Sequence, residues 1–132
     1  MRSHGHYTIE TIGRMLSVDA TGPFNEALIH DYQHDLKSSV EALSPEPWAM
    51  LVTLHDESLF TPEAEAELTK VIIWRKSMGM TKVGLIFVHT VGSEILKAQM
   101  TRMYDAAGVE HAYFDNIDAA RIWLGNPDRP AR

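Results

Sequence analysis

The segment Trp48-Ala49-Met50-Leu51-Val52-Thr53-Leu54 is an almost unbroken apolar run, and it decides the fold class. A strand covered on one face alternates apolar and polar residues, whereas a strand inside a parallel sheet is buried on both faces and reads as a continuous apolar run. The run is also too short for a buried helix. It therefore predicts a central strand of an α/β protein, and the apolar residues 83–88 predict a second strand beside it.

Helical patterns flank these two strands. Asn25 is a good N-cap, and apolar residues recur every three or four positions behind it. Thr61 and Pro62 suit the cap and the first turn of the next helix. We expect helices over about 25–43, 61–78, 93–107 and 116–124.

Shorter strands complete the pattern at both ends of the chain. Alternation in residues 7–9 and 16–20, with Gly13 and Arg14 between them, predicts an antiparallel hairpin. Residues 109–114 predict a last strand. This order predicts an α/β layer fold with a mixed central sheet of about five strands and about four helices. We expect one domain over residues 1–132, with its core at about 7–124 and a flexible tail at 125–132.

Composition narrows the class of protein. The 132 residues are 45% apolar and 23% charged, which is the balance of a folded domain. No apolar stretch is long enough to span a bilayer, and the first residues lack the apolar core of a signal peptide, so we expect a cytoplasmic protein. The absence of cysteine excludes disulfides and thiolate chemistry. The net charge of −6 argues against nucleic acid as a partner.

One C-terminal segment resembles a known family. The stretch Ala112-Tyr113-Phe114-Asp115-Asn116-Ile117-Asp118-Ala119-Ala120-Arg121-Ile122-Trp123-Leu124 is similar to the last strand and "FD…A..WL" helix of the SpoIIAA-like family, a bacterial group related to STAS and CRAL-TRIO domains. The order of elements also resembles the STAS fold of that family, from about Tyr7 to Leu124. The resemblance implies a SpoIIAA-like (STAS) fold for the whole domain.

The resemblance also implies two functions. STAS regulators carry a phosphoacceptor serine before their second helix and have a kinase as partner. Here residues 59–64 contain no Ser-Ser-Gly turn, and only Thr61 and the preceding Ser58 offer hydroxyls. The phosphoacceptor is therefore not assigned to any residue. CRAL-TRIO relatives imply instead a hydrophobic ligand held under helices.

The second and third predicted helices are more apolar than a single core-facing stripe requires. The segment 71–74, Val-Ile-Ile-Trp, carries apolar side chains all the way round the second helix. Methionines on the third helix suit a surface that repacks readily. This pattern fits core packing with a dimer contact, or a cleft for a ligand or membrane. The candidate ligand-binding residues are Leu68, Ile72, Ile73, Trp74, Leu96, Met100 and Met103.

Polar candidates are weaker. Glu26, His30 and His34 share one helical face at metal-ligand spacing, but neighbouring acids make a solvated face the better interpretation, so we predict no metal site. His89 ends a buried strand, where α/β sheets often bind ligands, although it also suits an ordinary loop. Arg75 and Lys76 near the end of the second helix are expected to complement the helix dipole and face solvent.

These observations lead to one prediction and one alternative. No nucleophile elbow, phosphate loop or dinucleotide motif is present, so we predict a non-enzymatic protein without a cofactor. We expect it to bind a hydrophobic small molecule or lipid, or a membrane surface as a peripheral protein, through its second and third helices, with a homodimer as a further way to cover them. The alternative is a STAS-type regulatory module, similar to an anti-sigma antagonist, without the usual phosphoacceptor serine. The sequence does not identify the ligand, the protein partner or the oligomeric state.

Overall fold

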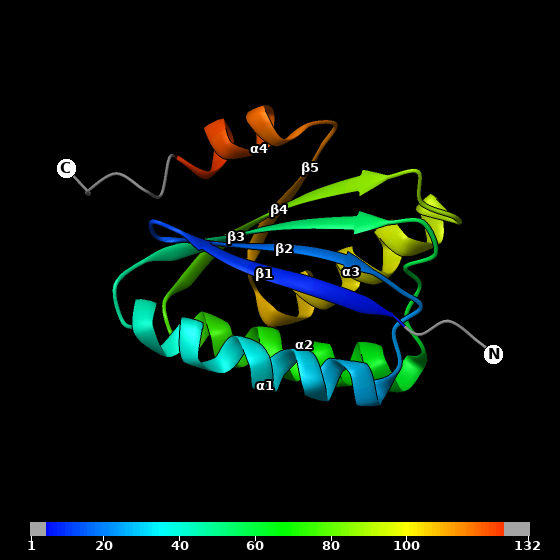
Figure 1. The fold of residues 1–132 in the computed structure, drawn as a ribbon, viewed down its shortest axis with the longest axis horizontal. Helices are drawn as coiled ribbons and strands as arrows, with labels where there is room; N and C mark the ends of the chain where they lie inside the picture. The colour runs from blue at the N-terminus through cyan, green and yellow to red at the C-terminus, as the bar shows by residue number, and fades with distance from the viewer. Residues whose placement is uncertain (1–4, 126–132) are drawn as a thin grey trace.

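The strands lie in the sheet in the same order as in the chain (Figure 1). The computed structural model describes residues 5–125, in which one five-stranded sheet is accompanied by four helices. The prediction of an α/β fold with a mixed sheet is confirmed. The strands are β1 (His6–Ile12), β2 (Met15–Thr21), β3 (Trp48–His55), β4 (Met80–Val88) and β5 (Glu110–Phe114). The helices are α1 (Glu26–Leu43), α2 (Pro62–Ser77), α3 (Ser93–Ala107) and α4 (Ile117–Leu124).

The sheet is mixed because only its first pair of strands is antiparallel. Strands β1 and β2 form the predicted hairpin, in which Ile12 lies opposite Met15. Gly13 adopts a φ of 58° in the turn, a conformation that favours glycine. The remaining pairs, β2 with β3, β3 with β4 and β4 with β5, are parallel.

The helices divide unequally between the two faces of the sheet. Helices α1, α2 and α3 cover one face, and α4 alone lies on the other (Figure 1). Each of the first three connects two neighbouring parallel strands while the chain moves steadily across the sheet. Because such crossovers are right-handed, the three helices come to the same face. The main core lies under them, and a smaller one lies under α4 around Leu51, Ile86 and Leu124.

The predicted central strands are buried on both faces. Val52 on β3 is 6% exposed and Ile86 on β4 is 3% exposed, and the two strands are parallel neighbours. The predicted N-caps Asn25 and Thr61 also form, and Asn116 caps α4 in the same way: each side chain accepts a hydrogen bond from the backbone N–H group three residues ahead. Local sequence therefore determines where α1, α2 and α4 begin.

Two predictions concern the ends of the chain and the membrane. The tail expected at 125–132 lies outside the described residues except for Gly125. Within residues 5–125, none of the helices combines the length and the apolar character that crossing a bilayer requires.

Candidate functional site

A cavity of about 40 Å³ lies between α1, α2, α3 and the first three strands. Its wall is apolar and aromatic except for one charged side chain, Arg75. The main core of the protein therefore contains a small space at its centre, reached by residues from almost every element on that side. The lining residues are Tyr7, Val18, Ala20, Phe24, Leu28, Ile29, Tyr32, Val52, Leu54, Phe60, Leu68, Arg75, Met100 and Tyr104.

Arg75 is the residue that distinguishes this cavity from an ordinary packing defect. It lies in the last turn of α2 and is 1% exposed. Its Nη1 donates to the sulfur of Met50 at 3.5 Å, and its guanidinium lies over the ring of Tyr32. Sulfur is a weak hydrogen-bond acceptor. An aromatic ring attracts a cation, but it does not offer the two oxygen acceptors with which a carboxylate binds a pair of N–H groups.

The other edge of the Arg75 guanidinium is unsatisfied. Nε and Nη2 are buried, and no group in residues 5–125 accepts a hydrogen bond from either atom. Among the described residues, no aspartate or glutamate lines the cavity. Arginine keeps its positive charge in proteins, and burying a charge without a partner is strongly unfavourable. The cavity lining thus includes a charged side chain with two buried donors that lack an acceptor.

Arg102 shows how the same two nitrogen atoms of an arginine, Nε and Nη2, bind a carboxylate in this protein. Its Nε and Nη2 donate to the two carboxylate oxygens of Glu65 at 2.5 and 2.7 Å. These hydrogen bonds lower the pKa of Glu65 below its ordinary value, although partial burial acts in the opposite direction. Nε and Nη2 of Arg102 therefore both have acceptors, whereas the same two atoms of Arg75 have none among the described residues.

Tyr7 and Leu28 form the outer part of the cavity wall, because they are its only partly exposed residues among those that the structure describes. The Tyr7 ring packs edge-on against Tyr32 with 5.3 Å between ring centres. Its hydroxyl donates to Oδ2 of Asp35 at 2.5 Å and so ties β1 to α1. Burial raises the pKa of the Tyr7 hydroxyl, and the hydrogen bond to Asp35 raises it further.

Tyr104 lines the cavity from α3. It is 2% exposed, and burial raises the pKa of its hydroxyl well above the ordinary value. The nearby Arg75 charge lowers the pKa of Tyr104 in part, but burial dominates. Tyr7 and Tyr104 are consequently neutral near pH 7.

The predicted ligand-binding residues are mostly core residues. Ile73 is 50% exposed, and Trp74 lies in a shallow surface groove between α1 and α2. Of the seven candidates, the structure brings Leu68 and Met100 to the cavity. The cavity therefore lies deeper than the predicted cleft between α2 and α3 and involves α1 as well. The candidates buried in the main core are Leu68, Ile72, Leu96, Met100 and Met103.

The expectation that Arg75 faces solvent was wrong. Arg75 follows Leu68 by seven residues and Val71 by four, so it lies on the buried face of α2. This spacing is the signal that could have identified it. The other cations near α2 and α3 have separate partners: Lys76 donates to the carbonyl of Gly108, whereas Lys97 lies over the ring of Tyr113.

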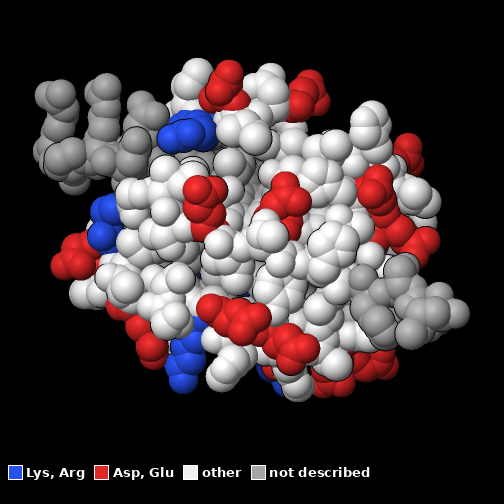
Figure 2. All heavy atoms as spheres, viewed as in Figure 1, with Lys and Arg blue, Asp and Glu red and all other residues white. Residues whose placement is uncertain are grey.

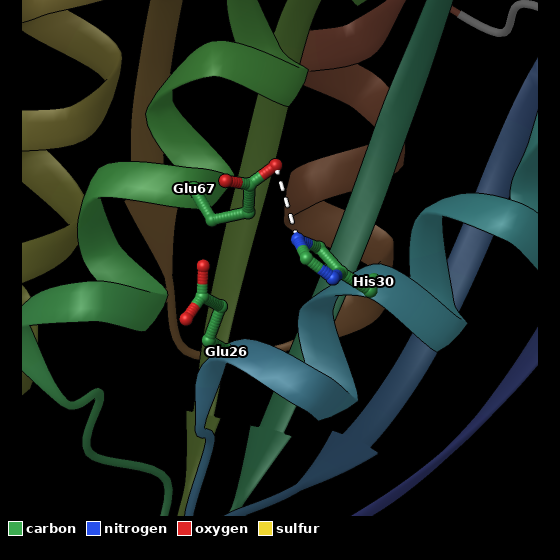
Figure 3. Close-up of side chains that lie close together, drawn as sticks. All are labelled: Glu26, His30 and Glu67. Atoms are coloured by element: carbon green, nitrogen blue, oxygen red, sulfur yellow. Dashed lines mark ion pairs between the residues drawn. The ribbon is translucent and has the colours of Figure 1, made fainter.

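Outside the cavity, one polar cluster joins α1 to α2. Glu26, His30 and Glu67 place their ligand-type atoms within 4.8 Å of one another, with His30 Nε2 3.4 Å from Glu67 Oε2 (Figure 3). Two of these residues belong to the face that we considered for a metal, but the third comes from α2 instead of being His34. Glu26 and His30 are exposed, and the pair between His30 and Glu67 holds the two helices together at the surface.

The turn that a STAS regulator would use is occupied by structural hydrogen bonds. Ser58 is fully buried, and its hydroxyl donates to the carbonyl of His55 and accepts from the backbone of Gly22. Thr61 caps α2 through the backbone N–H of Ala64. His89 is exposed at the end of β4 with a φ of 52°. Nothing in the described residues gathers a second site around it.

The charged side chains of the protein are predominantly acidic. Figure 2 shows Asp and Glu side chains spread over the face in view, with few Lys or Arg among them, in keeping with the net charge of −6. The positive charge that matters for an anion is therefore the buried one on Arg75.

Comparison with known proteins adds no family to this description. A scan against protein-family models and searches of curated proteins and of solved structures give no match to this chain. The cavity and its arginine are accordingly the basis for the functional proposal.

Proposed function

We propose that the chain is a non-enzymatic binding domain of the SpoIIAA-like (STAS) fold that holds a small hydrophobic molecule in the cavity beneath α1 and α2. The lining of the cavity is the observation that carries the proposal. Side chains such as Val18, Val52 and Leu68 offer an incoming apolar group a surface free of competing polar atoms. Transfer of apolar surface from water into such an environment is favourable.

The size of the cavity limits its occupant. One water molecule needs about 10–15 Å³ of such space, and an engineered apolar cavity of about 150 Å³ binds benzene. The space of about 40 Å³ therefore takes a group of a few heavy atoms. A larger ligand extends outward past Tyr7 and Leu28, and Met100 can repack at modest cost to make room.

The titratable groups of the cavity favour binding over catalysis. They are Tyr7, Tyr32, Tyr104 and Arg75. A general base has a pKa near the working pH and accepts a proton there. Arginine stays protonated, and the raised pKa values of Tyr7 and Tyr104 keep these two tyrosines protonated as well. Tyr7, Arg75 and Tyr104 are therefore not suited to remove a proton from a ligand near neutral pH.

An NMR titration with butanol, a neutral apolar probe, tests the proposal. We expect saturable shifts of the methyl groups of Val18, Val52, Leu68 and Met100. Leu68→Phe fills the cavity and should abolish these shifts, whereas Ile73→Phe adds the same ring on the exposed side of α2 and should leave them unchanged. Shifts that do not saturate, or that survive Leu68→Phe, would exclude the cavity as the binding site.

The same proteins distinguish the other functions. Flotation with liposomes that depends on Ile73, without shifts in the cavity, would favour a membrane surface. An obligate dimer that covers Ile73 and Trp74 would favour packing between copies. Kinase-dependent phosphate on Thr61 or Ser58 would favour the STAS-type regulatory module, although the hydrogen bonds of both hydroxyls argue against it.

A further inference from the structure

Arg75 brings a full positive charge into a cavity that is otherwise apolar. A hydrophobic ligand alone leaves Nε and Nη2 of Arg75 without acceptors. Asp35 on α1 and Glu65 on α2 have partners of their own: Asp35 accepts from Tyr7 and Glu65 accepts from Arg102. Arginine does not lose its proton, so the buried side chain keeps its charge. An acceptor for Nε and Nη2 would therefore have to come from outside the described residues.

The unpaired edge of Arg75 matches a carboxylate. Nε and Nη2 lie on one side of the planar guanidinium, and two parallel N–H groups there bind the two oxygens of a carboxylate. Arg102 uses these same two atoms for the carboxylate of Glu65. The protein itself therefore shows the geometry that a ligand carboxylate would take on Arg75.

The rest of the lining restricts the ligand further. Arg75 is the only lysine, arginine or histidine among the described lining residues, so the wall balances one negative charge. The remaining residues are apolar or aromatic apart from the hydroxyls of three tyrosines. A phosphate group carries more charge and needs more donors than this wall offers.

We infer that the ligand is a short-chain aliphatic monocarboxylate, whose carboxylate accepts hydrogen bonds from Nε and Nη2 of Arg75 and whose alkyl group contacts Val18, Val52 and Leu68. This inference rests on the proposed function, because the alkyl group occupies the same cavity. The volume of about 40 Å³ holds a few heavy atoms of such a ligand, and Met100 would repack to admit the remainder. A longer chain would extend past Tyr7.

Isothermal titration calorimetry with butyrate and butanol at constant ionic strength tests the inference. We expect wild type to bind butyrate at least about tenfold more tightly than butanol, because hydrogen bonds to charged groups are the stronger ones. Arg75→Met should remove this advantage and keep the binding of butanol. Arg102→Met removes an equivalent guanidinium that already has a partner, and it should behave as wild type.

Arg75→Lys provides a second variant that keeps the charge and loses the two-point edge, and it should weaken butyrate binding while preserving the fold. If both Arg75 variants fail to fold, the comparison of butyrate with butanol in wild type still tests whether a carboxylate adds affinity. Equal affinities for butyrate and butanol would overturn the inference and leave the proposed function standing. Binding of neither compound would overturn both. If chloride or inorganic phosphate bound as tightly as butyrate, the site would bind anions without specificity. That result would overturn the carboxylate assignment.

Discussion

The guanidinium carbon of Arg75 lies 4.9 Å from the centre of the Tyr32 ring. A buried cation is thus attracted by an aromatic face on the neighbouring helix, where most buried arginines have a carboxylate. Cation–π contacts contribute about 2 kcal/mol when they are desolvated. The contact therefore reduces the unfavourable free energy of burying Arg75 and couples α1 to α2.

A double-mutant cycle measures this coupling. Tyr32→Leu should lower the free energy of unfolding by about 1–2 kcal/mol more in wild type than in Arg75→Met, as followed by urea denaturation. Phe24→Leu is the control, because Phe24 also lines the cavity, and it should have the same effect in both backgrounds. Equal effects of Tyr32→Leu in the two backgrounds would show that the ring does not stabilise the cation.

Arg75→Met alone should make the ligand-free protein more stable. Replacing buried charged groups by apolar residues of similar volume is often neutral or stabilising, by about 1–4 kcal/mol for buried pairs. We expect an increase of about 1 kcal/mol in the free energy of unfolding, because the lost contact with Tyr32 offsets part of the gain. Arg102→Met should give no increase. A marked loss of stability in Arg75→Met would identify Arg75 as a structural residue.

Tyr7→Phe tests whether the Tyr7 side chain controls entry to the cavity. The variant keeps the ring and loses the hydrogen bond to Asp35, so the stability should fall by only about 1 kcal/mol. The rates of ligand binding and release, measured by NMR exchange, should both rise several-fold at nearly constant affinity. Tyr113→Phe removes a hydroxyl that bonds to Thr101 away from the cavity and should leave the rates unchanged. Unchanged rates in Tyr7→Phe would place the entrance elsewhere.

The buried hydroxyl of Tyr104 predicts a loss of stability at alkaline pH. Burial raises the pKa of Tyr104 above its ordinary value of 10.0 in the folded state, so above pH 10 the unfolded chain loses this proton first. Stability is therefore complete below pH 10 and falls as pH rises, by up to about 1.4 kcal/mol per pH unit for this group. Urea unfolding from pH 8 to pH 11.5 should give a shallower decline for Tyr104→Phe. An identical decline would contradict the raised pKa.

The pair formed by Glu65 and Arg102 predicts an acid-dependent loss. The hydrogen bonds from Arg102 lower the pKa of Glu65 from 4.5 in the folded state. Their contribution is present above pH 4.5 and is lost as pH falls through the lowered pKa of the folded protein. Glu65→Gln should reduce the difference in stability between pH 6 and pH 3. Glu63→Gln, at an exposed position in the same helical turn, is the control, and a difference as large as wild type in Glu65→Gln would disprove the assignment.

The positions of the elements could be predicted from the sequence because the signals are local. Asn25, Thr61 and Asn116 accept hydrogen bonds within their own helices, and the run at 48–54 is buried because its neighbours on both faces are apolar. The cavity could not be predicted in the same way. Its volume depends on the distances between α1, α2 and the sheet, whereas periodicity gives only the buried face of each helix.

The burial of Arg75 was harder still to predict from the local sequence. Its spacing from Leu68 and Val71 places it on the buried face, but a cation in the last turn of a helix is ordinarily explained by the helix dipole. What keeps it buried is tertiary, namely Tyr32 on α1 and Met50 on β3. The contact between Glu67 and His30 is also tertiary, because His30 lies on another helix.

The order of the strands in the sheet has a consequence for how the protein is made. Every strand pairs with the one that immediately precedes it in the chain. As the polypeptide leaves the ribosome, each new strand can therefore add to an edge that already exists, and none has to insert between two earlier ones. The part of the cavity wall formed by β1, β2, α1 and β3 is synthesised before α2, so α2 would deliver Arg75 to a surface already in place.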